Sequence, residues 1–151
     1  MSSPFIFIAT NRLKPGRLER ERRRVPRLVE FIEASEPRVI AFNEYVNEAG
    51  DEVTVVQFHP DAESMEAHMA IVRERAQEAY ADTLDATVRI QVFGRPTDAI
   101  FNALRQQAGS GVDISVNARL SNGLPGLGEF RGYRRGHRPA RLPVADPAHR
   151  W

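Results

Sequence analysis

The spacing of hydrophobic residues changes early in the chain and predicts the first two elements. Aromatic and branched residues crowd positions 5–13, which predicts a strand, and a Lys-Pro-Gly turn at 14–16 ends it. Over 17–34 the apolar residues recur at helical spacing and arginines fill the opposite side, which predicts an amphipathic helix. Pro26 lies inside this pattern, so we expect the helix to kink or split there.

The following segments again alternate between extended and helical patterns. Two extended runs, 38–48 and 52–59, flank a short polar loop with a glycine and predict a β-hairpin. Asp61 then opens a second helix as an N-cap residue, because its carboxylate can accept hydrogen bonds from free amides of the first turn. Residues 86–94 alternate cleanly and predict a half-buried strand. Its apolar side comprises Val88, Ile90 and Val92, and its polar side Thr87, Arg89 and Gln91.

The order strand, helix, strand, strand, helix, strand predicts an α+β fold of the ferredoxin-like kind. One antiparallel sheet then carries both helices on one face, and its other face stays bare. The first and the last strand of this unit carry too many apolar residues for the helices to cover all of them. We therefore predict a homodimer through the open sheet face. The residues that raise this question are Ile6, Ile8, Val88, Ile90 and Val92.

A further unit follows Pro96. Thr97 or Asp98 can cap a short helix closed by Gly109, and the alternation over 112–120 predicts a fifth strand, at a sheet edge or reaching across a dimer interface. From 121 onward glycine, proline and arginine dominate and the periodicity ends. We divide the chain into a ferredoxin-like α/β-barrel domain (1–95), a helix-strand extension of it (96–120) and a partly flexible arm (121–151).

Composition narrows the classes of function. The chain of 151 residues has no cysteine, which excludes disulfides, thiolate metal sites and cysteine nucleophiles. No secretory leader or membrane-spanning run is seen, so we expect a cytoplasmic protein without membrane contact. The net charge of +1 hides arginine-rich segments near both ends. Without aromatic interleaving they favour solvated surface over a nucleic-acid site, which stays a third and weaker hypothesis.

Two stretches carry a resemblance to a known family. The strand and turn from Ile8 to Gly16, followed by a charged helix, resemble the opening of the dimeric α/β-barrel superfamily, and more narrowly its antibiotic-biosynthesis-monooxygenase-like group. The run from Phe58 to His68 resembles that group's third strand and second helix. The resemblance covers Phe5 to Gly94. It implies a ligand pocket between helices and sheet, and a membership that ranges from cofactor-free oxygenases to haem-degrading enzymes and proteins without known activity.

Asn11 and His68 are the candidate catalytic residues. Asn11 shares a face of the first strand with the residues that should cover the core, so its amide could enter the pocket and position a ligand, or it could satisfy backbone groups at the strand end. His68 borders the apolar stripe of the second helix, where it could act as an axial ligand or general base, or pack as an ordinary buried histidine.

Apolar candidates surround these two residues. Because Phe42 and Tyr45 fall on opposite faces of one strand, we expect one in the pocket and the other at an interface. The spacing of His59, Asp61 and His68 does not suit a metal site, so we expect none. The predicted ligand-binding residues are Phe7, Phe42, Tyr45, Phe58, Met65 and Met69.

The leading hypothesis is a dimeric protein that binds a hydrophobic, aromatic small molecule, as a monooxygenase that needs no cofactor. An apolar pocket would desolvate an ionisable substrate so that its anion reacts with oxygen. The alternative is a non-catalytic ligand-binding or interaction protein on the same fold. Haem degradation is less favoured, because the pattern of the haem-degrading relatives includes a tryptophan on the second helix and the only tryptophan here is Trp151.

Overall fold

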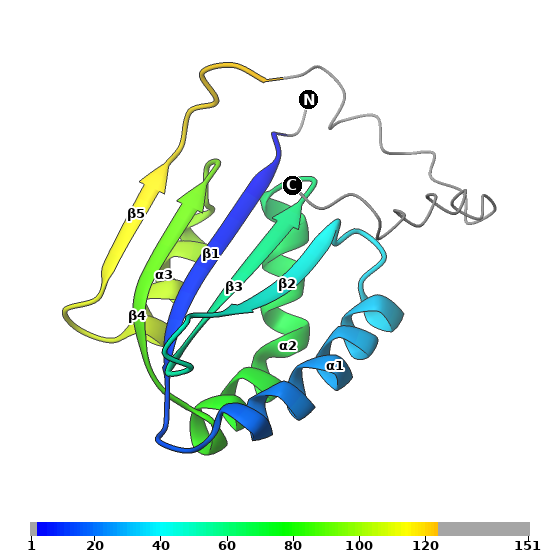
Figure 1. Cartoon of the computed structure of the whole chain (residues 1–151). Coiled ribbons are helices and arrows are strands. Elements are labelled where there is room, and N and C mark those ends of the chain that lie inside the picture. Colours follow the sequence, from blue (N-terminus) through cyan, green and yellow to red (C-terminus); the bar gives the residue numbers. More distant parts are fainter. Residues whose placement is uncertain (1–2, 124–151) are drawn as a thin grey trace, which may run out of the picture.

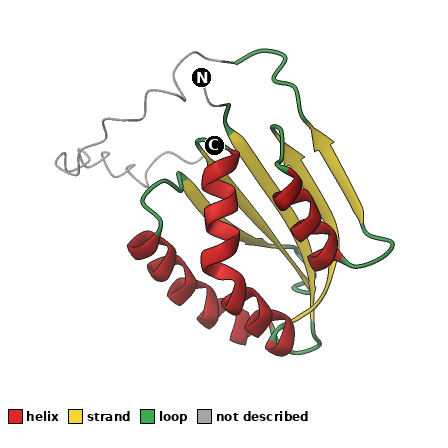
Figure 2. Cartoon of the chain, turned by 180° about the vertical axis from the view of Figure 1, so that it is seen from behind, coloured by secondary structure: helices red, strands yellow, loops and turns green. Residues whose placement is uncertain are grey.

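The computed structural model describes residues 3–123 and contains a five-stranded sheet covered on one face by three helices (Figures 1 and 2). The arm predicted for 121–151 lies almost wholly outside the described residues. The elements in chain order are β1 (Phe5–Leu13), α1 (Leu18–Ser35), β2 (Ala41–Val46), β3 (Glu52–His59), α2 (Ala62–Asp82), β4 (Leu84–Phe93), α3 (Asp98–Ala108) and β5 (Asp113–Asn117).

The strand order is β2-β3-β1-β4-β5, which confirms the predicted ferredoxin-like α+β architecture. The first four strands pair antiparallel, whereas β5 pairs parallel with β4 after the crossover through α3. β5 therefore extends the sheet at one edge and is shorter than the predicted strand. In the view from behind, all three helices lie in front of the sheet (Figure 2).

Local sequence explains where the helices begin and end. Asp61 caps α2 as predicted, since its side chain accepts a hydrogen bond from the Ser64 amide at 2.8 Å. Thr97 caps α3 in the same way, and Gly109 ends it. Of the two expected effects of Pro26, a kink or a split, the split is wrong, because α1 runs without a break from Leu18 to Ser35. Such a residue removes one backbone donor, which the rest of an 18-residue helix can tolerate.

A β-bulge in β4 changes the predicted faces of that strand. The pairing with β1 shifts between Thr10 and Asn11, so that Val88 is inserted opposite no partner. Thr87 consequently turns to the helix side, where it is buried, and Val88 is exposed. Strict alternation predicts the opposite, with Val88 on the covered face and Thr87 on the open face. Ile90, together with Val92, is fully covered by helices, so part of the apolar surface predicted to need a partner is already in the core.

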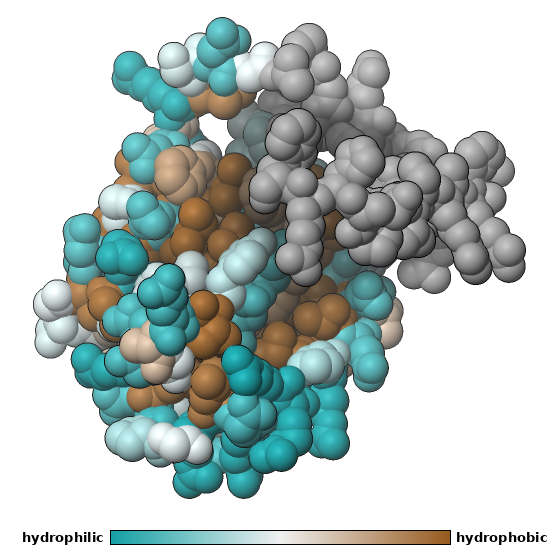
Figure 3. Space-filling model, viewed as in Figure 1, coloured by the Kyte–Doolittle hydropathy of each residue, from teal (hydrophilic) through white to brown (hydrophobic). Residues whose placement is uncertain are grey.

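The open face of the sheet still carries apolar side chains. Ile6 of β1 pairs with Phe58 of β3 on one side and with Phe93 of β4 on the other, which makes an apolar row across three strands. Both phenylalanines are exposed. Figure 3 shows apolar surface exposed among polar residues on this face. None of the described helices is both long enough and apolar enough to cross a lipid bilayer.

Candidate functional site

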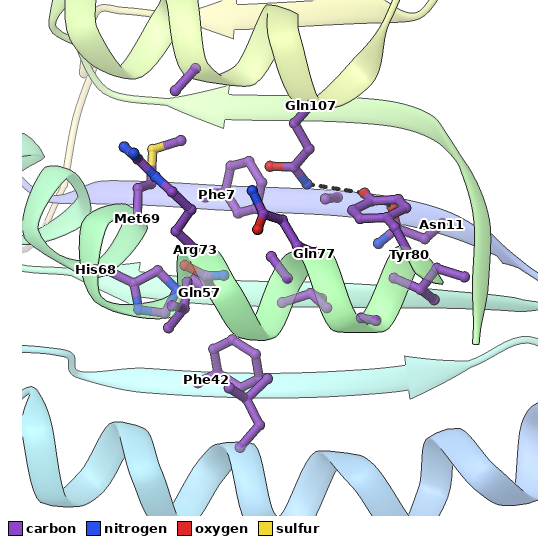
Figure 4. A pocket seen from close by; sticks show the side chains of 18 of the residues that line it. Phe7, Asn11, Phe42, Gln57, His68, Met69, Arg73, Gln77, Tyr80 and Gln107 are labelled. Atoms are coloured by element: carbon purple, nitrogen blue, oxygen red, sulfur yellow. Dashed lines mark hydrogen bonds between the residues drawn. The ribbon is translucent and has the colours of Figure 1, made fainter. Parts of the chain in front are cut away.

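A cavity of about 560 Å³ lies between the helices and the sheet, where the family resemblance places a ligand pocket. Its floor is formed by β1, β2 and β3, and its walls by α1, α2 and α3 (Figure 4). Most lining side chains are apolar, and the volume of the cavity suits a small organic molecule. The apolar lining includes Phe7, Phe42, Val55, Met65, Met69 and Val72.

One end of the cavity holds a histidine paired with a carboxylate. Nδ1 of His68 lies 2.9 and 3.0 Å from the two carboxylate oxygens of Glu36, and both residues are buried. Glu36 follows directly after α1, whereas His68 lies on the second turn of α2, so the pair joins the two helices. Because a carboxylate accepts, Nδ1 carries a proton, and in the neutral ring Nε2 has the lone pair. The arrangement is that of an oriented general base.

A second histidine supports the same end of the cavity. Nε2 of His59 donates to Oε1 of Gln57 at 3.1 Å, and Nδ1 accepts from the Ser64 hydroxyl at 3.0 Å. Burial, with the nearby His68 as a second cause, lowers the pKa of His59 to about 4. The ring is therefore neutral at neutral pH. It packs edge-on against His68 with ring centres 5.4 Å apart, and so fixes Gln57 and His68 together.

At the other end, Asn11 belongs to a network of side-chain hydrogen bonds. Its Oδ1 lies 2.9 Å from the Tyr80 hydroxyl and 3.0 Å from the Thr87 hydroxyl, which themselves lie 2.6 Å apart. Gln107 of α3 donates to Tyr80 at 3.1 Å, the contact dashed in Figure 4. Asn11 therefore bonds to side chains of α2 and β4, and its Oδ1 does not accept from the backbone. The β4 bulge makes this possible by turning Thr87 inward.

Three cavity-lining residues each have a side-chain nitrogen without a hydrogen-bond partner among residues 3–123. Among residues 3–123, every fully enclosed side-chain nitrogen or oxygen has a hydrogen-bond partner. Nε2 of His68, Nε2 of Gln57 and Nδ2 of Asn11 make no hydrogen bond within that part of the chain, so they are not fully enclosed. Their residues are only 2%, 5% and 4% exposed and all line the cavity. The cavity is thus the place where these nitrogens meet a ligand or water.

The structure brings together most of the predicted site residues. Asn11 and His68 line the same cavity at different ends. Tyr45 and Phe58 do not line it, because both point to the open face of the sheet, where Tyr45 is 60% exposed. The predicted ligand-binding residues that line the cavity are Phe7, Phe42, Met65 and Met69.

Several polar residues of the site were missed by the sequence analysis. Gln57 had a signal, since alternation along 52–59 places it on the core-facing side of its strand, where a polar residue is unusual. Tyr80 lies at the end of the second helical pattern, where an aromatic residue is ordinarily part of the core, so it gave no distinct signal. Glu36 had no signal beyond its position at a helix end, because its partner lies 32 residues further along the chain. No three potential metal ligands cluster within the described residues.

The fold of this chain is similar to that of several solved structures. No protein-family model matches the sequence, and no curated protein does either. Among solved structures, MupZ from Pseudomonas fluorescens superposes with a TM-score of 0.62 at 14% identity, over 83% of this chain and 97% of MupZ. An antibiotic biosynthesis monooxygenase superposes with a TM-score of 0.52 at 17% identity, over 62% and 99% of the two chains. A conserved protein from Methanosarcina mazei gives 0.53 at 19%, over 63% and 94%.

The chain has the antibiotic-biosynthesis-monooxygenase-like fold. At such identities the likeness establishes the fold and leaves the reaction open. The match with MupZ covers more of this chain than the residues up to Gly94 can supply. The superposition therefore extends beyond the residues that the sequence resemblance covers. Within this chain, the α3–β5 extension matters for the site, because α3 supplies Gln107 and one wall of the cavity.

Proposed function

We propose that the protein binds an apolar small molecule with an ionisable C–H or O–H group and that His68 removes this proton. The observation that carries the proposal is Nε2 of His68, which has no hydrogen-bond partner among residues 3–123 and belongs to a cavity-lining side chain, while Glu36 holds the opposite nitrogen. When Nε2 takes a proton, the imidazolium that forms is stabilised by the carboxylate beside it. Gln57 lies at the same end, where its free amide N–H groups suit the oxygen of the resulting anion.

The reaction that this site suits is oxygenation without a cofactor. A resonance-stabilised carbanion can pass one electron to O₂, and the substrate radical and superoxide combine to a peroxide anion. This anion takes a proton back from His68 and becomes a hydroperoxide. Loss of water from the hydroperoxide leaves a carbonyl, so that one oxygen atom enters the product and the other leaves as water. The apolar walls favour this step because they desolvate the anion. The likeness to an antibiotic biosynthesis monooxygenase supports this choice among reactions that begin with proton removal.

We also propose that a second copy of the chain covers the open face of the sheet. The apolar row formed by Phe58, Ile6 and Phe93 lies on the face opposite the cavity. Two copies related by a two-fold axis could bury these rows against each other without closing the cavity mouth between the helices.

The test uses anthrone, an apolar ketone with an acidic C–H, as the probe. Oxygenation of anthrone consumes one O₂ and yields anthraquinone and water, so an oxygen electrode follows it. Under argon, exchange of the acidic C–H for deuterium measures proton removal alone. We expect His68→Gln to lower both rates at least 100-fold and Glu36→Gln at least tenfold. Glu33→Gln is the matched control, since Glu33 is an exposed carboxylate in the last turn of α1 and makes no ion pair within residues 3–123.

The two readouts separate the possible errors. Deuterium exchange that depends on His68 without oxygen uptake would retain the base and refute the oxygenase. Binding of anthrone without exchange would favour the alternative of a non-catalytic ligand-binding protein. If His68→Gln behaves like wild type in both assays, the assignment of the base is wrong.

A further inference from the structure

We infer that the ligand is elongated and has two polar ends, an ionisable proton donor at one end and a carbonyl or ether oxygen at the other. This rests on the proposed function and names the class of substrate for the same site. The cavity-facing polar atoms do not form one cluster. Those of His68 and Gln57 lie at one end and that of Asn11 lies at the other (Figure 4). Apolar side chains of the sheet lie between them, and the exposed residues Arg73 and Gln77 line the cavity from α2.

The two ends are separated by a measurable length of regular structure. Gln57 pairs with Phe7 of β1, whereas Asn11 lies four residues further along the same strand. A strand rises about 3.3 Å per residue, so the two ends are roughly 13 Å apart along the sheet. On the helix side, His68 and Tyr80 are twelve residues apart on α2, or roughly 18 Å at 1.5 Å per residue. A compact ligand cannot contact both ends at once.

The hydrogen-bond roles of the two ends are opposite. Nε2 of His68 has a lone pair and needs a proton donor from the ligand. Oδ1 of Asn11 already accepts from a hydroxyl of Tyr80 or Thr87, so the group left for the ligand is the amide N–H, which needs an acceptor. The network behind Asn11 fixes this orientation. The three contacts among Asn11, Tyr80 and Thr87 share two hydroxyl protons, and Oδ1 has none to give.

The middle of the cavity defines the rest of the ligand. Between the polar ends, the side chains that line the floor and the adjoining part of α2 are apolar, and the residues concerned are Ala9, Val55, Met69, Val72 and Ala76. The polar residues of α2 that also line this part, Arg73 and Gln77, are exposed to solvent. Hydrogen-bonding groups of a ligand that face the sheet would be desolvated there without a partner. The side of the ligand that faces the sheet is therefore apolar between its two ends.

A set of rigid probes tests the inference by equilibrium binding. The two-ended probe is 4-acetyl-4′-hydroxybiphenyl, with a phenol at one end and a ketone at the other. The single-ended probe is 4-phenylphenol, which lacks the ketone. The short probe is 4-hydroxyacetophenone, which has both groups on one ring. We expect the two-ended probe to bind at least tenfold more tightly than either of the others.

Variants test whether the Asn11 end of the cavity causes this difference in affinity. Asn11→Asp keeps the shape of the side chain and removes its N–H donors, so the two-ended probe should lose its advantage over 4-phenylphenol. The affinity for 4-phenylphenol should stay within about twofold. A variant that merely loosened the cavity would weaken both probes equally. Thr10→Val is the control, because Thr10 is the neighbouring residue on the opposite face of β1 and bonds to Thr54.

The outcomes separate this inference from the proposed function. Equal affinities for 4-acetyl-4′-hydroxybiphenyl and 4-phenylphenol, with binding that still depends on His68, would overturn the two-ended ligand and retain the base. An advantage that survives Asn11→Asp would also overturn it. If 4-phenylphenol fails to bind or binds equally well to His68→Gln, the proposed function itself is refuted.

Discussion

The contribution of Glu44 to the stability of the folded state should fall as the pH rises. Its side chain projects from β2 to the helix side, towards Glu21 of α1. Glu21 is fully buried and accepts from Arg24 at 2.9 Å and from the Thr83 hydroxyl at 2.5 Å. Burial, and then the negative charge of Glu21, raise the pKa of Glu44 to about 8. At neutral pH Glu44 is therefore protonated and can donate to Glu21.

The size of the effect follows from linkage. Between its ordinary pKa of 4.5 and about 8, Glu44 binds its proton in the folded state and has lost it in the unfolded state. Its contribution to stability is complete below pH 4.5 and is lost as the pH rises to 8. At ~1.4 kcal/mol per pH unit the ceiling is about 5 kcal/mol. Because β2 is an edge strand that water can reach, we expect about half of this.

Thermal unfolding of Glu44→Gln measures this effect. Glutamine keeps the shape and can still donate to Glu21, but it cannot ionise. Relative to wild type, the variant should gain roughly 5–10 °C in Tm between pH 5 and pH 9. Glu33→Gln, which removes an exposed carboxylate of α1, should follow the wild-type profile. Parallel pH profiles of wild type and Glu44→Gln would refute the shared proton between Glu21 and Glu44.

Three further predictions concern other parts of the fold. Gly94→Ala should destabilise the protein by about 2 kcal/mol more than Gly109→Ala, measured by urea unfolding; both residues have positive φ, but a Cβ at Gly94 would lie 2.9 Å from the Pro4 carbonyl oxygen, and none lies near Gly109. The contribution of His59 to stability should decrease as the pH falls from 6.5 to 4, because the pKa of His59 is lowered and only the unfolded chain takes up the proton; His59→Gln should therefore gain stability relative to wild type over this range in a calorimetric pH series. Phe58→Glu should shift a sedimentation profile from dimer to monomer without lowering Tm by more than a few degrees; a monomeric wild type would refute the proposed partner of the open face.

The sequence by itself determined the order and type of the elements. The change from alternating to helical spacing located β1, α1, the β2–β3 hairpin, α2 and β4, and the N-caps Asp61 and Thr97 placed two helix starts. These features are local, so a single chain segment contains all the information for them. The same alternation placed Asn11 on the face of β1 that lines the cavity. The apolar stripe of the second helix placed His68 at its border, and His68 also lines the cavity.

The tertiary structure alone decided how the site is completed. Glu36 reaches His68 because α1 and α2 pack on the same face of the sheet, a contact between residues 32 positions apart that no local pattern encodes. Thr87 reaches Asn11 only because one inserted residue in β4 reverses the alternation there. Alternation along the strand separated Phe42 from Tyr45, but only the packing of the helices decided that Phe42 faces the cavity and Tyr45 the open face. A side chain's chemistry is read from the sequence, but its partners are set by pairing register and packing, which depend on the whole fold.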